Sequence, residues 1–285
     1  MKILVPGADG QLGRQFAEVL RTDDHSVTAL NREKLDITDA EAVQDAISQY
    51  EPDVVINCAA YNFVDKAEPE FEIANEVNAY GVRNLAMSCS KSKALLIHFS
   101  SDYVFDGKKG DFYTEEDKPN PINRYGQSKL LGEKLLMEET DNFLLFRVSW
   151  VFGEGRQNFL FKLSEWAKNR RILKIVYDQI SIPTYTGDIV SITLFALCKG
   201  LRGVYHLTNG GYASRYEVAR YFLERLGLDN LVLPVSSDYF PSPATRPYFS
   251  AMSNSKISGE LDVTIPEWKI GIDRYVMGMF EKEDI

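Results

Sequence analysis

Gly7-Ala8-Asp9-Gly10-Gln11-Leu12-Gly13 decides the fold, because it joins the apolar run Ile3-Leu4-Val5 to a segment with helical periodicity. Between a first strand and a first helix, such a turn brings the backbone close to a pyrophosphate at the helix N-terminus. The spacing differs from G-x-G-x-x-G, and a tight turn that needs positive φ would look similar. The position favours dinucleotide binding by Gly7, Gly10, Gln11 and Leu12.

Short apolar runs alternate with helical segments through the first half of the chain. This alternation predicts an α/β fold, a Rossmann-type doubly wound parallel sheet that binds ligands at the carboxyl ends of its strands. The pattern loosens from about residue 150, so we predict a dinucleotide-binding domain over 1–149, with further elements returning from the C-terminal half, and a smaller substrate-binding lobe mainly over 150–285. The expected strands are 3–5, 27–30, 54–56, 95–97 and 143–146, and the expected helices are 12–20, 40–50, a segment through 82–85, and 121–139.

Composition narrows the class of protein. A chain of 285 residues with 45% hydrophobic and 26% charged residues is expected to be globular, and a net charge of −9 argues against a nucleic-acid partner. Cys58, Cys89 and Cys198 are odd in number and lie in apolar segments, so we expect reduced thiols. The three histidines show no metal-ligand spacing, and no apolar run is long enough for a membrane span. We expect a cytoplasmic protein without a zinc site, and whether magnesium is bound stays open.

Tyr125 and Lys129 are four residues apart in an expected helix. Residues at i and i+4 share one helix face, roughly 5–6 Å apart at Cβ. The Lys129 charge can therefore favour the phenolate and lower a pKa that is ordinarily about 10. A phenol with such a pKa can exchange a proton with a carbonyl oxygen near neutral pH.

The segment after the second expected strand carries a cation and a carboxylate. Arg32 could meet a ribose 2′-phosphate, which favours NADPH over NADH as cofactor and leaves NADH open. Asp36 and Ile37 lie a few residues beyond the strand end and are candidates for lining the adenine. The alternative for this segment is a helix N-cap region, with Thr38 or Asp39 capping the next helix.

Small and hydroxyl side chains follow the next two strands. Cys58-Ala59-Ala60-Tyr61 would let the cofactor lie close to the backbone, although small residues are also common in loops. The fourth strand runs into Ser101, where a turn-forming role is the alternative. Together, Ser101, Tyr125 and Lys129 would supply a carbonyl-binding hydroxyl, a proton donor and a cation that lowers the donor's pKa.

With these residues, the chain resembles the extended short-chain dehydrogenase/reductase family over essentially its full length. Within that family it is most similar to the branch that reduces the C4 keto group of a dTDP-linked 4-keto-6-deoxyhexose with NADPH. The resemblance rests on Gly7–Gly13, 57–61, 64–68, 78–81, 101–107, Tyr125 with Lys129, 147–153, 178–179, 183–184 and 246–247.

The resemblance implies a role for each member of the group. Tyr125 is the general acid, Lys129 lowers its pKa and contacts the nicotinamide ribose, and Ser101 binds the sugar carbonyl. Val148 borders the nicotinamide, and Asn78 belongs to the helix that supports Lys129, with helix packing as its alternative. The implied process is nucleotide-sugar biosynthesis for cell-surface polysaccharide.

Further residues are expected to bind substrate. Asp102, Tyr103 and Trp150 are expected at the sugar, with a core role as the alternative for Trp150. Arg246 is the candidate for the diphosphate, with a surface ion pair as its alternative.

Two departures from the family accompany these expectations. The family more often has Thr at Ser101, and a smaller residue or glycine at Ile180 and Ser181. No metal site of the kind described for some relatives is assigned, and both a monomer and a homodimer stay open.

Two other classes of function remain as rivals. One is an epimerase or dehydratase that recycles its nicotinamide, although Asp102-Tyr103 lacks the acidic pair expected of a dehydratase. The other is a non-catalytic binding protein like the regulatory subunit of methionine adenosyltransferase, which resembles the same fold and retains the cofactor site.

Overall fold

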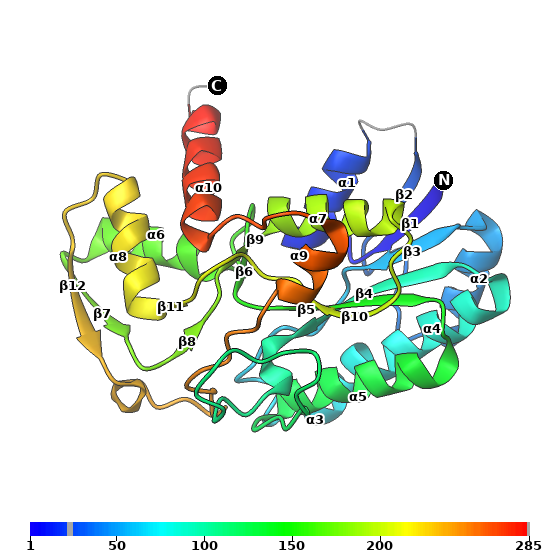
Figure 1. Cartoon of the computed structure of the whole chain (residues 1–285), viewed down its shortest axis with the longest axis horizontal. Helices are drawn as coiled ribbons and strands as arrows, with labels where there is room; N and C mark the ends of the chain where they lie inside the picture. Colours follow the sequence, from blue (N-terminus) through cyan, green and yellow to red (C-terminus); the bar gives the residue numbers. More distant parts are fainter. Residues whose placement is uncertain (22–24, 284–285) are drawn as a thin grey trace.

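A six-stranded sheet forms the centre of the computed structural model, which describes residues 1–21 and 25–283. The strand order is β10-β5-β4-β3-β1-β2 (Figure 1). Every neighbouring pair is parallel, so the predicted doubly wound fold is confirmed. The strands are β1 (Lys2–Pro6), β2 (Ser26–Leu30), β3 (Val54–Asn57), β4 (Leu95–Ser101), β5 (Phe143–Val148) and β10 (Gly203–His206).

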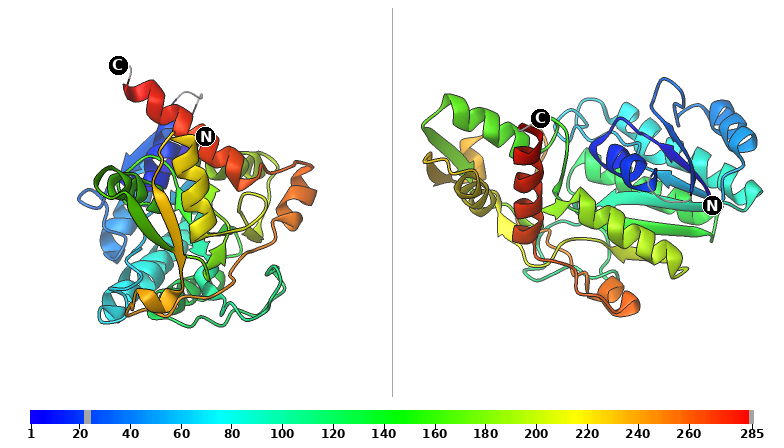
Figure 2. Two further views of the ribbon diagram at one scale, coloured as in Figure 1. Left: turned by 90° about the vertical axis from the view of Figure 1, so that its left-hand side faces the viewer. Right: turned by 90° about the horizontal axis from the view of Figure 1, so that it is seen from above.

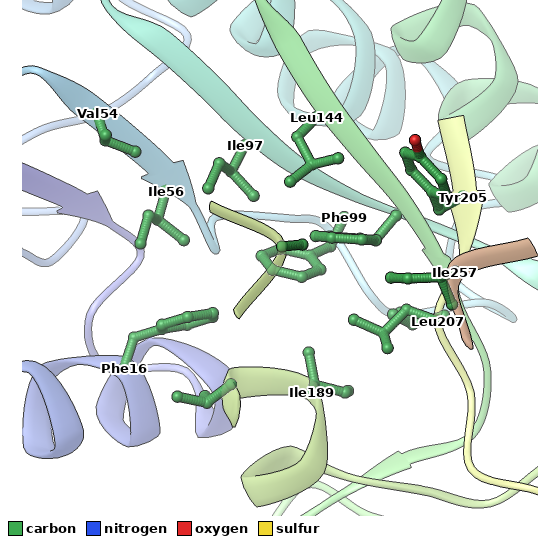
Figure 3. Close-up of a cluster of buried hydrophobic side chains, with 14 of the residues drawn as sticks. Phe16, Val54, Ile56, Ile97, Phe99, Leu144, Ile189, Tyr205, Leu207 and Ile257 are labelled. Carbon is green, nitrogen blue, oxygen red and sulfur yellow. The ribbon is translucent and has the colours of Figure 1, made fainter. Parts of the chain in front are cut away.

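Helices cover both faces of the sheet. One face carries α2 (Ala40–Tyr50), α4 (Gly81–Ser92) and α5 (Arg124–Glu139) over a core that includes Leu4, Leu96 and Leu145. The other face carries α1 (Gln11–Leu20), α7 (Thr186–Cys198) and α9 (Ser255–Leu261). Figure 3 shows the second core, where Phe16, Phe99 and Ile189 meet from helix and strand. Burial on both faces explains why the strands are continuous apolar runs.

The C-terminal half contributes to both parts of the molecule. It returns β10, α7 and α9 to the sheet, and it also builds a lobe at one end (Figures 1 and 2). The lobe has its own core, with Leu163, Phe222 and Trp268 among its buried side chains. Its main elements are α6 (Phe159–Asn169), β7 (Ile172–Val176), α8 (Arg215–Arg225), β12 (Leu231–Val235) and α10 (Trp268–Glu283).

The remaining elements are short. They are α3 (Phe71–Asn75), the π-helical turn η1 (Glu76–Tyr80), the 3-10 turns η2 (Asp102–Val104) and η3 (Ser237–Tyr239), and the strands β6 (Val151–Phe152), β8 (Ile180–Ser181), β9 (Thr184–Tyr185) and β11 (Ala213–Ser214).

Capping side chains explain where two expected helices begin. Asp39 accepts hydrogen bonds from two first-turn amides of α2, which is the capping alternative considered for this segment. Helix α5 begins at Arg124 and not at Pro121, because the Asn123 side chain accepts from the Gly126 amide and caps the helix there. Among the described helices, none has both the length and the apolar character needed to span a bilayer.

Candidate active site at the sheet edge

The glycine turn packs directly against the loop after β3. Gly7 has φ 77°, and a Cβ there would lie 2.4 Å from the Ala59 nitrogen. A Cβ at Gly13 would lie 2.3 Å from the Gly7 carbonyl oxygen. Helix α1 starts after Gly10 without a side-chain cap or a first-turn acid, which leaves its N-terminus suited to an anion. The turn therefore fits the diphosphate of a dinucleotide.

The loop after β2 brings a cation and a carboxylate together. Arg32 is exposed, and its Nε lies 3.0 Å from the Asp36 carboxylate. Burial alone would raise the pKa of Asp36, but hydrogen bonds from Thr38 and the Arg32 charge lower it overall. The Ile37 side chain packs into the core beneath α4, where a Cβ on Gly81 would meet it. Arg32 and Asp36 are thus the polar groups presented at this strand end.

Asn78 ties the loop after β3 to the helix that carries Tyr125 and Lys129. Its side chain accepts from the Tyr61 amide at 2.9 Å and donates to the Ser128 hydroxyl at 3.0 Å. Asn78 is buried and lies in the π-helical turn η1, a feature often found at functional sites. The residues expected to lie along the cofactor, Cys58 to Tyr61, are thereby held against α5.

The three expected catalytic side chains come together at the end of β4. Ser101 is the last residue of that strand and pairs in register with Val148 of β5. Its hydroxyl faces the Tyr125 hydroxyl, which donates to Asn62 Oδ1 at 3.3 Å. Lys129 is buried, and its ammonium donates to the Phe99 carbonyl oxygen at 2.7 Å.

Burial governs the protonation of this group. It raises the pKa of Tyr125 well above its ordinary value, and the Ser101 hydrogen bond offsets only part of that rise. Burial also lowers the pKa of Lys129 to about 8, against the opposing charge of Glu133. The direction for Tyr125 is opposite to the one expected from Lys129 alone, because desolvation of the phenolate is the largest influence and Asp102 and Tyr103 add to the rise.

Asp102 and Tyr103, which are expected at the sugar, are both buried. The Asp102 carboxylate accepts hydrogen bonds from serine hydroxyls. The Tyr103 ring meets that of Tyr125 edge to face, with centroids 5.7 Å apart. Its hydroxyl is within hydrogen-bonding reach of Arg215 and Arg246. Tyr103 therefore lies between the proposed acid and two cations.

Both cations line a cavity of about 1000 Å³ in the lobe. Trp150 lies on its wall with φ 39°, half-buried and packed against the core of the lobe. Among the described residues of the lining, none is Asp or Glu. The cations of the lining are Lys162, Arg170, Lys174, Arg215 and Arg246.

Arg246 forms the ion pair considered as its alternative, and its contact with the diphosphate stays a prediction. Its guanidinium holds Asp65 through two hydrogen bonds of 3.0 and 2.7 Å, and it also lines the cavity. Asp65 belongs to the segment 64–68 that carried part of the family resemblance. The ion pair thus anchors Arg246 at the cavity mouth between the loop after β3 and the lobe.

The whole chain matches known proteins. Residues 1–280 match the family model described as the RmlD substrate binding domain. The chain belongs to this family. It is 38% identical to a dTDP-4-dehydrorhamnose reductase of Mycolicibacterium smegmatis over 94% of this chain and 83% of that one, and 34% identical to the spore coat polysaccharide biosynthesis protein SpsK of Bacillus subtilis over 96% of each.

Solved structures of RmlD-family proteins have the same fold. A dTDP-4-dehydrorhamnose reductase of Clostridium acetobutylicum superposes with a TM-score of 0.95 at 34% identity, over 98% of this chain and all of that one. One of Bacillus anthracis, solved in complex with NADP, gives the same TM-score and identity over 97% and 99%. The predicted membership of the extended short-chain dehydrogenase/reductase family is confirmed.

Sequence reasoning missed Arg215, which is part of this RmlD-family site. It is the first residue of α8, and its guanidinium lies 3.6 Å from the centroid of the Trp150 ring. No ion pair among the described residues involves it, and burial lowers its pKa to about 10. A cation in the first helical turn opposes the helix dipole, and the capping box of Ser214 and Glu217 marks that turn in the sequence. That combination could have identified it.

Proposed function

We propose that this protein is an NADPH-dependent reductase that converts the C4 keto group of dTDP-4-dehydro-L-rhamnose to the hydroxyl of dTDP-L-rhamnose. The observation that carries the proposal is the lobe cavity, where the described lining residues include five cations and no carboxylate in a chain of net charge −9. Such a lining suits a dianionic diphosphate. The proposal is also supported by the relatives named dTDP-4-dehydrorhamnose reductase and by the relative solved with NADP.

The cavity offers separate partners to each part of a nucleotide sugar. Arg215 and Arg246 would bind the diphosphate, since both guanidinium groups reach the cavity beside Tyr103. The aromatic side chains of Phe159 and Trp166, which line the cavity, would contact the base. Trp150 would then lie beside the sugar, on the side nearest the sheet edge.

The cofactor would be held by the turn Gly7–Gly13 and the loop Cys58–Tyr61, with Val148 at the nicotinamide end. Bound there, it supplies the hydride that reduces C4. We assign its 2′-phosphate to Arg32, because that guanidinium is exposed at the end of β2, and this assignment is the reason for preferring NADPH to NADH.

Tyr125 would donate the proton to the carbonyl oxygen while Ser101 donates a hydrogen bond to it. The raised pKa of Tyr125 keeps the phenol protonated, so the proton is in place when substrate binds. The phenolate that results is stabilised by the nearby ammonium of Lys129, whose position is set by the Phe99 carbonyl. Negative charge on the carbonyl oxygen of the substrate would thereby be stabilised as it develops.

An NADPH-oxidation assay against dTDP-, UDP- and GDP-linked 4-keto sugars tests this proposal. We expect one NADPH to be consumed per molecule of the dTDP-linked substrate, with weaker or no turnover of the others. Conversion without net oxidation of NADPH would point to a recycling epimerase or dehydratase. Tight cofactor binding with no turnover of any sugar would favour a binding protein.

The three cysteines are free, which is in keeping with the cytoplasmic setting that we propose.

A further inference from the structure

Three serine hydroxyls converge on the carboxylate of Asp102, immediately after Ser101. Ser181 donates to Oδ2 at 2.9 Å and Ser250 donates to the same oxygen at 2.5 Å. Ser101 itself donates to Oδ1 at 3.1 Å. The exposed fractions of Asp102, Ser181 and Ser250 are 2%, 0% and 2%, so water does not compete for these bonds.

The three hydroxyls come from segments that are distant in sequence. Ser101 ends β4, Ser181 ends β8, and Ser250 precedes α9. A backbone hydrogen bond of 2.9 Å from Ser250 to the Ile180 carbonyl holds the last two segments together. No ion pair among the described residues includes Asp102; burial raises its pKa, and the three hydroxyls and the Arg215 charge oppose that rise. The two segments of the C-terminal half that carry Ser181 and Ser250 are thus joined to the end of β4.

The direction of these bonds determines where the Ser101 proton points. Ser101 donates to Asp102 Oδ1, so the Ser101 proton is turned to that carboxyl group. The Ser101 oxygen is then free to accept from the Tyr103 amide at 3.1 Å and to face the Tyr125 hydroxyl. When a carbonyl oxygen enters, Ser101 can turn its proton to it, because Asp102 keeps two serine donors and stays satisfied.

We propose that Ser181 and Ser250 are positioning residues which, through Asp102, hold the Ser101 hydroxyl where it meets both Tyr125 and the substrate carbonyl. The inference rests on the proposed reductase function and assigns part of its catalytic geometry to the second half of the chain. It also explains why Asp102, expected at the sugar, has its carboxylate directed toward serines.

Alanine substitutions at the two serines test the proposal in the full-length enzyme. Ser181→Ala and Ser250→Ala are each expected to lower kcat about 10- to 100-fold, because misplaced catalytic groups cost rate. The KM for the nucleotide sugar should stay within about threefold of wild type, since neither serine lines the cavity. Ser100→Ala is the matched control: it is a buried serine next to Ser101 whose hydroxyl has no hydrogen-bond partner among the described residues. Equal kcat values for Ser181→Ala and Ser100→Ala would overturn the proposal.

A double-mutant cycle separates positioning from general damage to the fold. In a Ser101→Ala background, the hydroxyl to be positioned is gone, so Ser181→Ala should reduce kcat by less than about twofold more. A merely structural role would persist in that background, and the two effects would multiply. Multiplicative effects would therefore contradict the proposal.

A spectroscopic measurement keeps this test independent of turnover. With ¹³Cζ-labelled tyrosine, the Tyr125 resonance can be assigned from its absence in Tyr125→Phe. It should shift in Ser181→Ala and Ser250→Ala but not in Ser100→Ala, because only the first two alter the Ser101 partner of the phenol. If the wild-type protein oxidises no NADPH, the proposed reductase function is wrong. The Tyr125 resonance in the serine variants still tests whether Ser181 and Ser250 position Ser101. An unchanged Tyr125 resonance in both serine variants would overturn that role.

Discussion

At the sheet edge the functional side chains are buried and hydrogen-bonded, whereas in the lobe cavity they are charged and only partly paired. Tyr125, Ser101 and Lys129 each have protein partners at hydrogen-bonding distance. In the cavity, Arg215 has an aromatic face and a phenol as neighbours, and no ion pair among the described residues includes it. The first region is organised before ligand arrives, and the second is left to be completed by an anion. Substitutions at the edge should therefore lower kcat, and those in the cavity should raise KM.

Removing the phenol should have the largest effect. Tyr125→Phe keeps the ring that packs against Tyr103 but removes the proton donor, so we expect kcat to fall about 10³-fold. Fluorescence titration should show that NADPH binding is retained. Tyr212→Phe, at an exposed tyrosine outside the cavity lining, is the control. Turnover that survives Tyr125→Phe would mean that another group is the acid.

Arg215→Ala should mainly affect substrate binding. Loss of a charge-assisted contact to the diphosphate is expected to raise the KM of the nucleotide sugar about 10- to 100-fold, with a much smaller change in kcat. Arg220→Ala removes a cation from the same helix outside the cavity and should leave KM unchanged. A fall in kcat at constant KM would place Arg215 with the catalytic group instead, and would contradict the difference in role between the sheet edge and the cavity.

The pH dependence of kcat/KM should report the buried ammonium. Lys129 has its pKa lowered to about 8, and the cation is the form that stabilises the phenolate, so kcat/KM should decline as pH rises above that value. One pH unit above the pKa about a tenth of the lysine stays protonated, so roughly a tenfold fall is expected near pH 9. A profile that stays flat to pH 10 would contradict this assignment.

The smallest effect is expected at the exposed edge of the cofactor site. Arg32→Ala should raise the KM for NADPH by roughly tenfold or less, because an exposed cation is screened by solvent, and should leave that for NADH unchanged. Lys34→Ala, two residues away, provides the control. Equal changes for the two cofactors would argue against a 2′-phosphate contact.

The sheet and its order of strands and helices were predictable because apolar periodicity and turn residues act locally. Gly7 and Gly13 show this well: strand, glycine turn and helix lie in consecutive residues, and the collisions that a Cβ would cause are with Ala59 and with the turn itself. The same holds for Tyr125 and Lys129, which share one helix, and for Asp39, whose cap lies within its own first turn. Family membership followed from these local motifs.

Other features depended on contacts between distant segments. Local sequence could not show that Ser181 and Ser250 meet Asp102, nor that Arg215 stacks on Trp150, because each pair is brought together by the packing of the lobe on the sheet. The pKa of Tyr125 is the clearest case. The sequence by itself determined which cation would be near the phenol, but only the tertiary structure decided how deeply both are buried, and desolvation is the larger influence.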